Sequence, residues 1–309
     1  MNIWYFSDNK PGHENQILGL IDQLKYHVTI QADRINCADY PHAFTSWLLK
    51  RHPKEINYAT PSLIIGAGHR THWPVIAASR ITGAKSLILM TPSLPLWMFD
   101  YVVAPEHDHL APNSKRFISM GALNRMKAAT KQADLGLILL GGESKHFIWD
   151  DKSIIQQIHH LVTKTPHIKW KITTSRRTPK SFCHQLENLL ENLKEEFYQI
   201  DELVFADQCP KGWLQQQMSC ASISWSTPDS VNMIYESLTA NCWVGIFSLD
   251  SKNTSVSDSI LSMIDKQKIN SFSYDSVAYQ GATQEQMFNE AERCARWLMA
   301  SLTKEVICD

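Results

Sequence analysis

Short apolar runs alternate with amphipathic stretches along the whole chain. Such runs are typical of strands buried in a parallel sheet, and the stretches between them are typical of the connecting helices. The pattern therefore predicts an α/β fold. In the first half it predicts strands at Ile3–Phe6, His27–Ile30, Ser62–Ile65, Ser86–Met90, Tyr101–Ala104 and Phe117–Ser119, with helices at Gln16–Leu24, Ala43–Lys50 and His72–Thr82.

A polar stretch, 124–134, separates this set of elements from a second one. The second set is predicted to contain strands at Leu135–Leu140, Lys169–Thr173, Leu203–Phe205, Ala221–Ser224, Val244–Phe247 and Ser271–Tyr274, with helices at Asp151–Lys164, Pro179–Phe197, Asp229–Ala240, Ser255–Lys266 and Gln284–Leu302. A chain of 309 residues exceeds the roughly 250–300 that one core supports. We therefore expect two Rossmann-like doubly wound domains, 1–128 and 129–309, facing a cleft, with the last helix packing back on the first domain.

The charge balance argues against nucleic acid as a partner, because Lys+Arg 30 against Asp+Glu 31 gives a net charge of -1. The sequence starts without the basic and apolar regions of a signal peptide, and it lacks a long apolar run, so we expect a cytoplasmic protein. The apolar residues 47–49 precede the basic segment 50–54, which suggests peripheral contact with an anionic inner membrane. Seven cysteines without a C-x-x-C pair are expected to be buried free thiols.

The polar segment 7–16 follows the first predicted strand, at the edge of the sheet where ligands of such folds bind. His13 or Glu14 in this segment could act as a general base toward a hydroxyl group. The alternative is that Glu14 or Asn15 caps the next helix while His13 is simply solvated.

Two other motifs argue against common cofactors. Gly66-Ala67-Gly68 lacks the third glycine and the later acidic residue of a dinucleotide-binding fingerprint, so no NAD-type cofactor is expected. The segment 105–109 crowds imidazoles and carboxylates together, but adjacent residues rarely converge on one ion, so no metal site is expected.

The loops of the second half favour anion binding. Gly141 and Gly142 follow a strand and can form a phosphate- or sugar-facing turn. Ser175, Arg176 and Arg177 follow the next strand, and guanidinium groups suit phosphate. The alternative for the arginines is a surface pair that only forms salt bridges.

The segment 226–236 predicts a strand end, a turn and a helix start with Pro228 at the first helical position. The helix N-terminus at Ser230 would then offer N–H groups to a phosphate. Helical spacing places Asp229, Asn232 and Glu236 on one face, where Glu236 could reach ribose hydroxyls. The alternative is an exposed polar face without a ligand.

The chain resembles the mitochondrial-fission "elongated mitochondria" (ELM-type) family, whose bacterial members are named as lipooligosaccharide outer-core glycosyltransferases. The resemblance rests on segments 10–16, 66–68, 99–100, 105–108, 121–124, 141–142, 175–179 and 229–236. It implies the two-domain glycosyltransferase architecture called GT-B, with the nucleotide-sugar held by the C-terminal half. It further implies that Arg176 and Arg177 face the diphosphate, that the Ser230 helix start assists, and that Glu236 holds the ribose.

Together these observations predict a metal-independent glycosyltransferase that needs no cofactor beyond its nucleotide-sugar donor. The expected acceptor is a cell-envelope saccharide or a lipid-linked molecule. A nucleotide-sugar epimerase is one alternative, since a similar cleft can hold the same ligand. A non-catalytic fission-type adaptor is another, and it would bind a protein partner instead.

Overall fold

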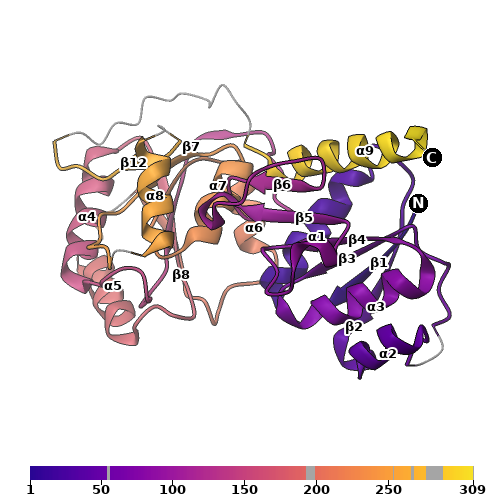
Figure 1. Cartoon of the computed structure of the whole chain (residues 1–309). Helices are drawn as coiled ribbons and strands as arrows, with labels where there is room; N and C mark the ends of the chain where they lie inside the picture. The colour runs from indigo at the N-terminus through magenta and orange to yellow at the C-terminus, as the bar shows by residue number, and fades with distance from the viewer. Residues whose placement is uncertain (54–55, 193–198, 253, 266–267, 276–287, 309) are drawn as a thin grey trace. The chain divides into compact units, whose positions relative to one another are not determined.

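The computed structural model describes residues 1–309 except 54–55, 193–198, 253, 266–267, 276–287 and 309. The chain forms two compact units, one of residues 1–125 with 289–309 and one of residues 126–288. Each unit contains a six-stranded parallel sheet within the described residues (Figure 1). The prediction of two Rossmann-like α/β units is confirmed, and each unit is described below by itself.

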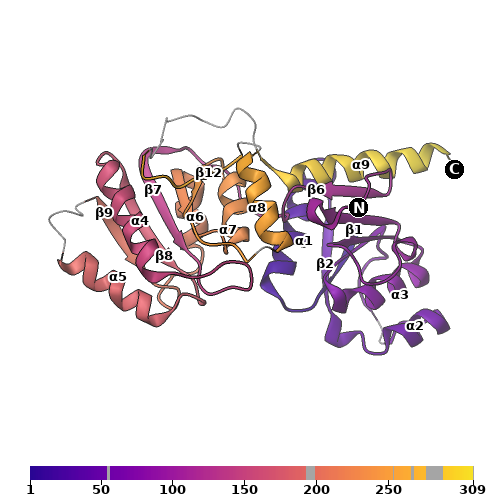
Figure 2. The same cartoon turned by 60° about the vertical axis from the view of Figure 1, so that its left-hand side comes forward.

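In the first unit the strand order is β2-β1-β3-β4-β5-β6. Its elements are β1 (Asn2–Ser7), α1 (Pro11–Leu24), β2 (Gln31–Asn36), α2 (Ala43–Leu49), β3 (Leu63–Ala67), α3 (His72–Thr82), β4 (Lys85–Leu89), β5 (Tyr101–Pro105), β6 (Arg116–Ser119) and α9 (Glu290–Cys308). Both sheet faces are covered by helices (Figure 2). Alternate residues of β1 show this, because Ile3 and Tyr5 pack in the core under α1 and α9, whereas Trp4 and Phe6 pack in the core under α2 and α3.

Helix α9 is remote in sequence but belongs to the first unit. Cys294, Ala295 and Leu298 are buried in the same core as residues of α1. The carboxylate of Glu290 accepts a hydrogen bond from the Met120 backbone N–H at 2.7 Å. These contacts fix the start of α9 against the end of β6.

In the second unit the strand order is β12-β11-β10-β7-β8-β9. Its elements are β7 (Gln132–Leu140), α4 (Asp151–Lys164), β8 (Lys169–Thr174), α5 (Lys180–Asn192), β9 (Ile200–Val204), α6 (Trp213–Cys220), β10 (Ala221–Ser226), α7 (Val231–Thr239), β11 (Trp243–Ile246), α8 (Ser255–Asp265) and β12 (Asn270–Ser271). Trp170 and Trp225 fill the core beneath α4 and α5. β8 and β9 follow β7 on one side, and β10 lies on the other side of β7, so the strand order reverses between β7 and β10. The loops after β7, β8 and β10 therefore lie at the same edge of this parallel sheet.

The strand expected at His27–Ile30 is wrong, because these residues form a turn and β2 follows them. β2 is an edge strand with one buried side chain, that of Ile35. An edge strand needs little apolar surface, so β2 has no apolar run in its sequence. The turn before it contains Val28 and Ile30 and therefore resembles a strand more closely. Helix α6 was also missed, since Met218 is its only buried residue.

Three predicted helices extend into residues outside the described ranges. The helix expected at Pro179–Phe197 is described as α5 only to Asn192, and the helix expected at Ser255–Lys266 is described as α8 only to Asp265. The helix expected at Gln284–Leu302 begins among residues that the structure does not describe. The six described cysteines are free, but only Cys242 and Cys294 are buried, so the expectation of uniformly buried thiols is wrong for the other four.

Candidate functional site

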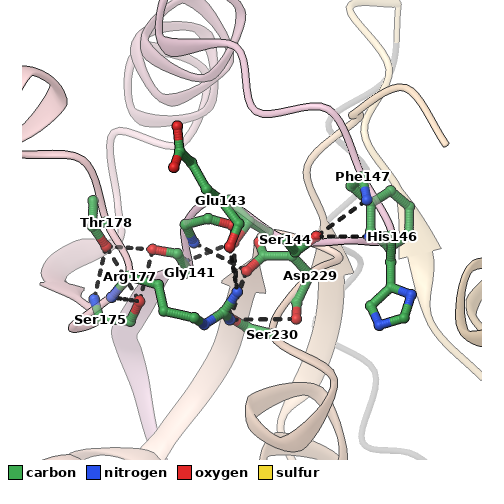
Figure 3. Close-up of polar contacts among 12 residues, drawn as sticks. Gly141, Glu143, Ser144, His146, Phe147, Ser175, Arg177, Thr178, Asp229 and Ser230 are labelled. Carbon is green, nitrogen blue, oxygen red and sulfur yellow. Dashed lines mark hydrogen bonds and ion pairs between the residues drawn. The ribbon is translucent and has the colours of Figure 1, made fainter. Parts of the chain in front are cut away.

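In the second unit the loop after β7 is packed tightly against the loops after β8 and β10 (Figure 3). A Cβ atom on Gly141 would lie within 3.0 Å of the Asp229 carboxylate, and one on Gly142 would overlap the Arg177 backbone. The N–H of Gly141 donates to Thr227 Oγ1 at 2.8 Å, and the N–H of Gly142 donates to Asp229 Oδ2 at 3.0 Å. The two glycines therefore allow close approach of protein loops, and their N–H groups are not free to hold a phosphate.

The loop after β8 is tied to the same place by hydroxyl groups. Ser175 Oγ donates to the Gly141 carbonyl at 2.8 Å, and Thr178 Oγ1 contacts the same carbonyl. The Ser175 N–H donates to Thr178 Oγ1 at 2.9 Å, and the Arg177 N–H donates to Ser175 Oγ at 3.1 Å. Ser175 thus fixes the backbone that carries the two arginines.

Arg177 forms an ion pair with Asp229, in which Nη2 lies 2.8 Å from Oδ2. The Asp229 side chain is 1% exposed, whereas the Arg177 side chain is 47% exposed. Arg177 Nη1 also donates to the Glu143 carbonyl at 3.0 Å. Both terminal nitrogens of this guanidinium group therefore take part in joining three loops, although about half of the side chain is exposed.

Arg176 is exposed and lines a pocket of about 490 Å³ at the carboxyl ends of β8 and β9. Lys180, at the start of α5, and Phe205 line the same pocket. The two cations share the pocket with two acidic residues, Glu187 and Asp207. Its other lining residues are Thr174, Ser175, Thr178, Cys183, His184, Ala206 and Gln208.

The helix start predicted at Asp229 is wrong, because α7 begins at Val231. The Ser230 N–H donates to the Thr227 carbonyl at 3.1 Å, which closes a turn. Pro228 occupies the second position of this turn, where its fixed φ is favourable, and so it does not begin the helix. Ser230 is the N-cap residue of α7 and makes no side-chain capping bond.

The expected common face of Asp229, Asn232 and Glu236 is also wrong in part, since Asp229 precedes the helix and turns back to Gly142 and Arg177. Asn232 is exposed in the first turn of α7, and Glu236 is half-buried two turns further along.

In the first unit His13 lies in the first turn of α1, next to the end of β1. Its Nδ1 donates to Asp8 Oδ2 at 3.0 Å, and the Asp8 side chain is fully buried. The imidazole covers the Cα of Gly68, where a Cβ atom would overlap the ring. Among the described residues no group bonds to His13 Nε2. A buried carboxylate therefore orients the imidazole and leaves Nε2 for a proton acceptor role.

Glu14, the second candidate base, is engaged differently. Its Oε1 accepts a hydrogen bond from Arg34 Nε at 2.7 Å, and this bond raises the pKa of the arginine. Arg34 Nη2 also donates to Ser7 Oγ at 3.0 Å and to Asn9 Oδ1 at 2.8 Å. Glu14 thus holds Arg34 at the edge of the sheet, and His13 is the better placed of the two bases.

No group of three or more His, Cys, Asp or Glu side chains suitable for a metal ion is found in the part of the chain that the structure describes. Within the segment 105–109, His107 Nε2 lies 3.7 Å from Asp108 Oδ1. No helix among the described residues is long and apolar enough to span a membrane.

The sequence interpretation did not single out Asp8, Thr178, Arg34 or Phe205. Asp8 could have been found, because it directly follows β1 and stands five residues before His13. Arg34 lies on the strand that was predicted in the wrong place. Thr178 lies in the segment 175–179 that carries the family resemblance, and Phe205 was predicted as the last residue of a strand, so neither was assigned to the site.

The sequence of the chain is similar to that of known proteins. The sequence profile of the family described as Mitochondrial fission ELM1 matches residues 11–302. The uncharacterized protein RP120 of Rickettsia prowazekii is 23% identical over 364 aligned positions, which cover 98% of this chain and 99% of that protein.

Two solved structures share the fold. The UDP-GlcNAc 2-epimerase of Methanocaldococcus jannaschii is 12% identical, with a TM-score of 0.58 over 97% of this chain and 100% of that chain. A second structure, described as a UDP-N-acetylglucosamine 2-epimerase of Listeria monocytogenes, is 9% identical, with a TM-score of 0.59 over 100% of this chain and 97% of that chain. At this identity the likeness shows the fold alone.

Proposed function

Since the chain belongs to the Mitochondrial fission ELM1 family and has two Rossmann-like units of the GT-B kind, we propose that it is a metal-independent glycosyltransferase. Its donor is a nucleotide-sugar, and its acceptor is a hydroxyl group of a cell-envelope saccharide or lipid-linked molecule. The observation that carries the catalytic part of this proposal is the pair formed by His13 and buried Asp8.

The donor binds in the second unit, at the carboxyl ends of β8 and β9. Arg176 and Lys180 line the pocket there and supply positive charge for a diphosphate. Arg177 contacts the diphosphate with the exposed part of its side chain, while its ion pair with Asp229 holds the loops after β8 and β10 together. The start of α7 at Ser230 adds the partial positive charge of a helix N-terminus.

Glu236 holds the ribose hydroxyls, with Asn232 beside it on α7. A carboxylate accepts hydrogen bonds from two neighbouring hydroxyl groups, which suits a ribose. This contact does not depend on the phosphates. Glu236 is therefore assigned to recognition of the nucleoside part of the donor.

In the reaction, His13 Nε2 accepts the proton of the acceptor hydroxyl. The hydroxyl oxygen at the same time forms a bond to the anomeric carbon of the donor sugar. The bond between that carbon and the diphosphate oxygen breaks, and the nucleoside diphosphate leaves with the electron pair. Asp8 stabilises the resulting imidazolium through Nδ1. Arg176 and the α7 start stabilise the charge that grows on the leaving group.

A nucleotide-sugar epimerase is the second candidate, because the fold is shared with two proteins described as UDP-GlcNAc 2-epimerases. Incubation with a nucleotide-sugar and no acceptor separates the two functions. An epimerase changes the sugar under these conditions, whereas a transferase leaves it intact or hydrolyses it slowly.

A thermal-shift screen against nucleotides and nucleotide-sugars tests the proposal as a whole. A ligand at 100 times its Kd adds about 2.7 kcal/mol to the free energy of unfolding, which gives a clear shift of the melting temperature. We expect nucleotide-sugars to produce this shift. The absence of a shift with every nucleotide and nucleotide-sugar at millimolar concentration would leave the non-catalytic adaptor as the function.

A further inference from the structure

Helix α2 exposes large apolar side chains at the periphery of the first unit. Phe44, Leu48 and Leu49 are 52%, 59% and 68% exposed. Ala43 and Ser46, on the opposite side of the helix, are buried. α2 lies next to α3 in both views (Figures 1 and 2). Folding therefore leaves a row of apolar side chains facing away from the core of this unit.

Phe44 of this row belongs to an aromatic cluster that joins α2 to α3. The ring of Phe44 stacks on Trp47 with centroids 5.8 Å apart and meets Trp73 of α3 edge-on at 4.9 Å. The Arg80 guanidinium lies 4.4 Å from the centre of the Trp47 ring. These contacts fix α2 against α3 and place the Arg80 cation beside the aromatic cluster.

The sequence of α2 and of the segment that follows it is basic. Residues 43–54 contain three Lys or Arg residues and no acidic residue, although the net charge of the whole chain is -1. Lys50 and Arg51 follow α2 directly and are exposed. No carboxylate among the described residues pairs with either of them. Their positive charge is therefore available to an external partner.

We propose that the α2 surface, formed by Phe44, Leu48, Leu49, Lys50 and Arg51, docks on an anionic lipid bilayer. The apolar side chains enter the headgroup region, and the two cations meet the acidic headgroups. This combination of exposed apolar groups with exposed basic residues suits a negatively charged membrane. A second copy of the chain fits less well, because a two-fold contact would bring the cations of both copies together.

Co-sedimentation of the full chain with lipid vesicles tests the proposal without reference to catalysis. The expected result is binding to vesicles of phosphatidylcholine with phosphatidylglycerol, weaker binding at high salt, and little binding to phosphatidylcholine alone. Lys50→Gln with Arg51→Gln should weaken binding about thirtyfold, since each basic residue near such a surface contributes about fivefold. Leu48→Ser with Leu49→Ser should weaken it at least tenfold.

Matched controls lie in the second unit. Leu261→Ser removes an apolar side chain of α8 that is 50% exposed, and Lys152→Gln with Lys164→Gln removes two exposed cations of α4. These variants should bind vesicles as the unmodified chain does. Equal binding by the α2 variants, or no binding of the unmodified chain at low salt, would overturn the proposal. Self-association in sedimentation velocity that Leu48→Ser with Leu49→Ser abolishes would overturn it too, because the surface would then belong to a second copy.

Discussion

His13 Nδ1 lies 3.0 Å from Asp8 Oδ2, and the carboxylate side chain is fully buried at the end of β1. The imidazole is thereby fixed in one tautomer with Nε2 available. Positioned general bases contribute roughly 10²–10⁴ to a rate. We expect His13→Ala to lower the rate of sugar transfer by about this factor and to leave nucleotide affinity unchanged, as measured by product formation and calorimetric titration.

The Asp8 carboxylate and Glu14 provide the matched comparison for this prediction. Asp8→Asn should lower transfer because an amide can favour the wrong tautomer of His13. Glu14→Gln should leave transfer nearly unchanged, since Glu14 is paired with Arg34. A larger loss in Glu14→Gln than in His13→Ala would move the role of base to Glu14.

Arg176 and Arg177 are adjacent in the sequence but differ in their contacts, so their variants should differ too. Arg177→Ala removes one partner of buried Asp229 and should lower the free energy of unfolding by about 2 kcal/mol. Arg176→Ala should leave stability within about 0.5 kcal/mol of the unmodified chain, because the side chain is exposed. Urea denaturation of both variants checks the difference, and equal losses would contradict the assignment of Arg177 to loop packing.

The loop after β7 has no room for a side chain at Gly141, so even one added methyl group there should destabilise the protein. Gly141→Ala should destabilise the second unit by about 3 kcal/mol, because the new Cβ would overlap Asp229 and Ser230. Gly12→Ala is the control, since a Cβ there meets no atom within 4 Å and Gly12 lies in α1. That control should stabilise the chain by about 0.5–1 kcal/mol. Thermal unfolding of both variants measures the contrast.

The buried His72 should make the free energy of unfolding depend on pH. Burial, followed by the nearby His69, lowers the pKa of His72 to about 4. The unfolded chain therefore takes up a proton near pH 6.5 that the folded chain does not, and the contribution of His72 is complete above pH 6.5 and is lost as pH falls toward 4. The total loss is about 3 kcal/mol. Urea denaturation at several pH values should show this slope in the unmodified chain and a smaller slope in His72→Leu.

Much of the fold follows from the alternation of apolar runs and amphipathic stretches. α3 and α4 occur at the predicted residues because their apolar positions repeat along the whole helix. The first five residues of α1 were missed, since Ile17 is the first buried residue of that helix and Pro11 gives the earlier start. The pattern of apolar residues therefore locates buried strands and amphipathic helices, but it does not locate polar edge strands or polar helix starts.

The candidate site was predicted as a set of loops, and the structure brings Gly141, Gly142, Ser175, Arg177 and Ser230 together. Their mutual contacts could not be predicted, because each depends on how three separate strands end at one sheet edge. Asp229 shows this best. Its carboxylate was expected on the face of a helix, and it instead joins Gly142 to Arg177.

The central claim is that the second unit binds a nucleotide-sugar through Arg176 and Glu236 without a metal ion. Calorimetric titration of nucleosides, nucleotides and nucleotide-sugars, with and without EDTA, tests it most directly in three proteins: the unmodified chain, the double variant Arg176→Ala with Arg177→Ala, and Glu236→Ala. The account predicts nucleotide-sugar binding that EDTA does not change and an affinity that is more than tenfold lower in the double arginine variant. Glu236→Ala should weaken nucleosides and nucleotides alike, whereas the arginine changes should spare nucleosides. Binding that EDTA abolishes, or no binding of any nucleotide-sugar at millimolar concentration, would contradict it.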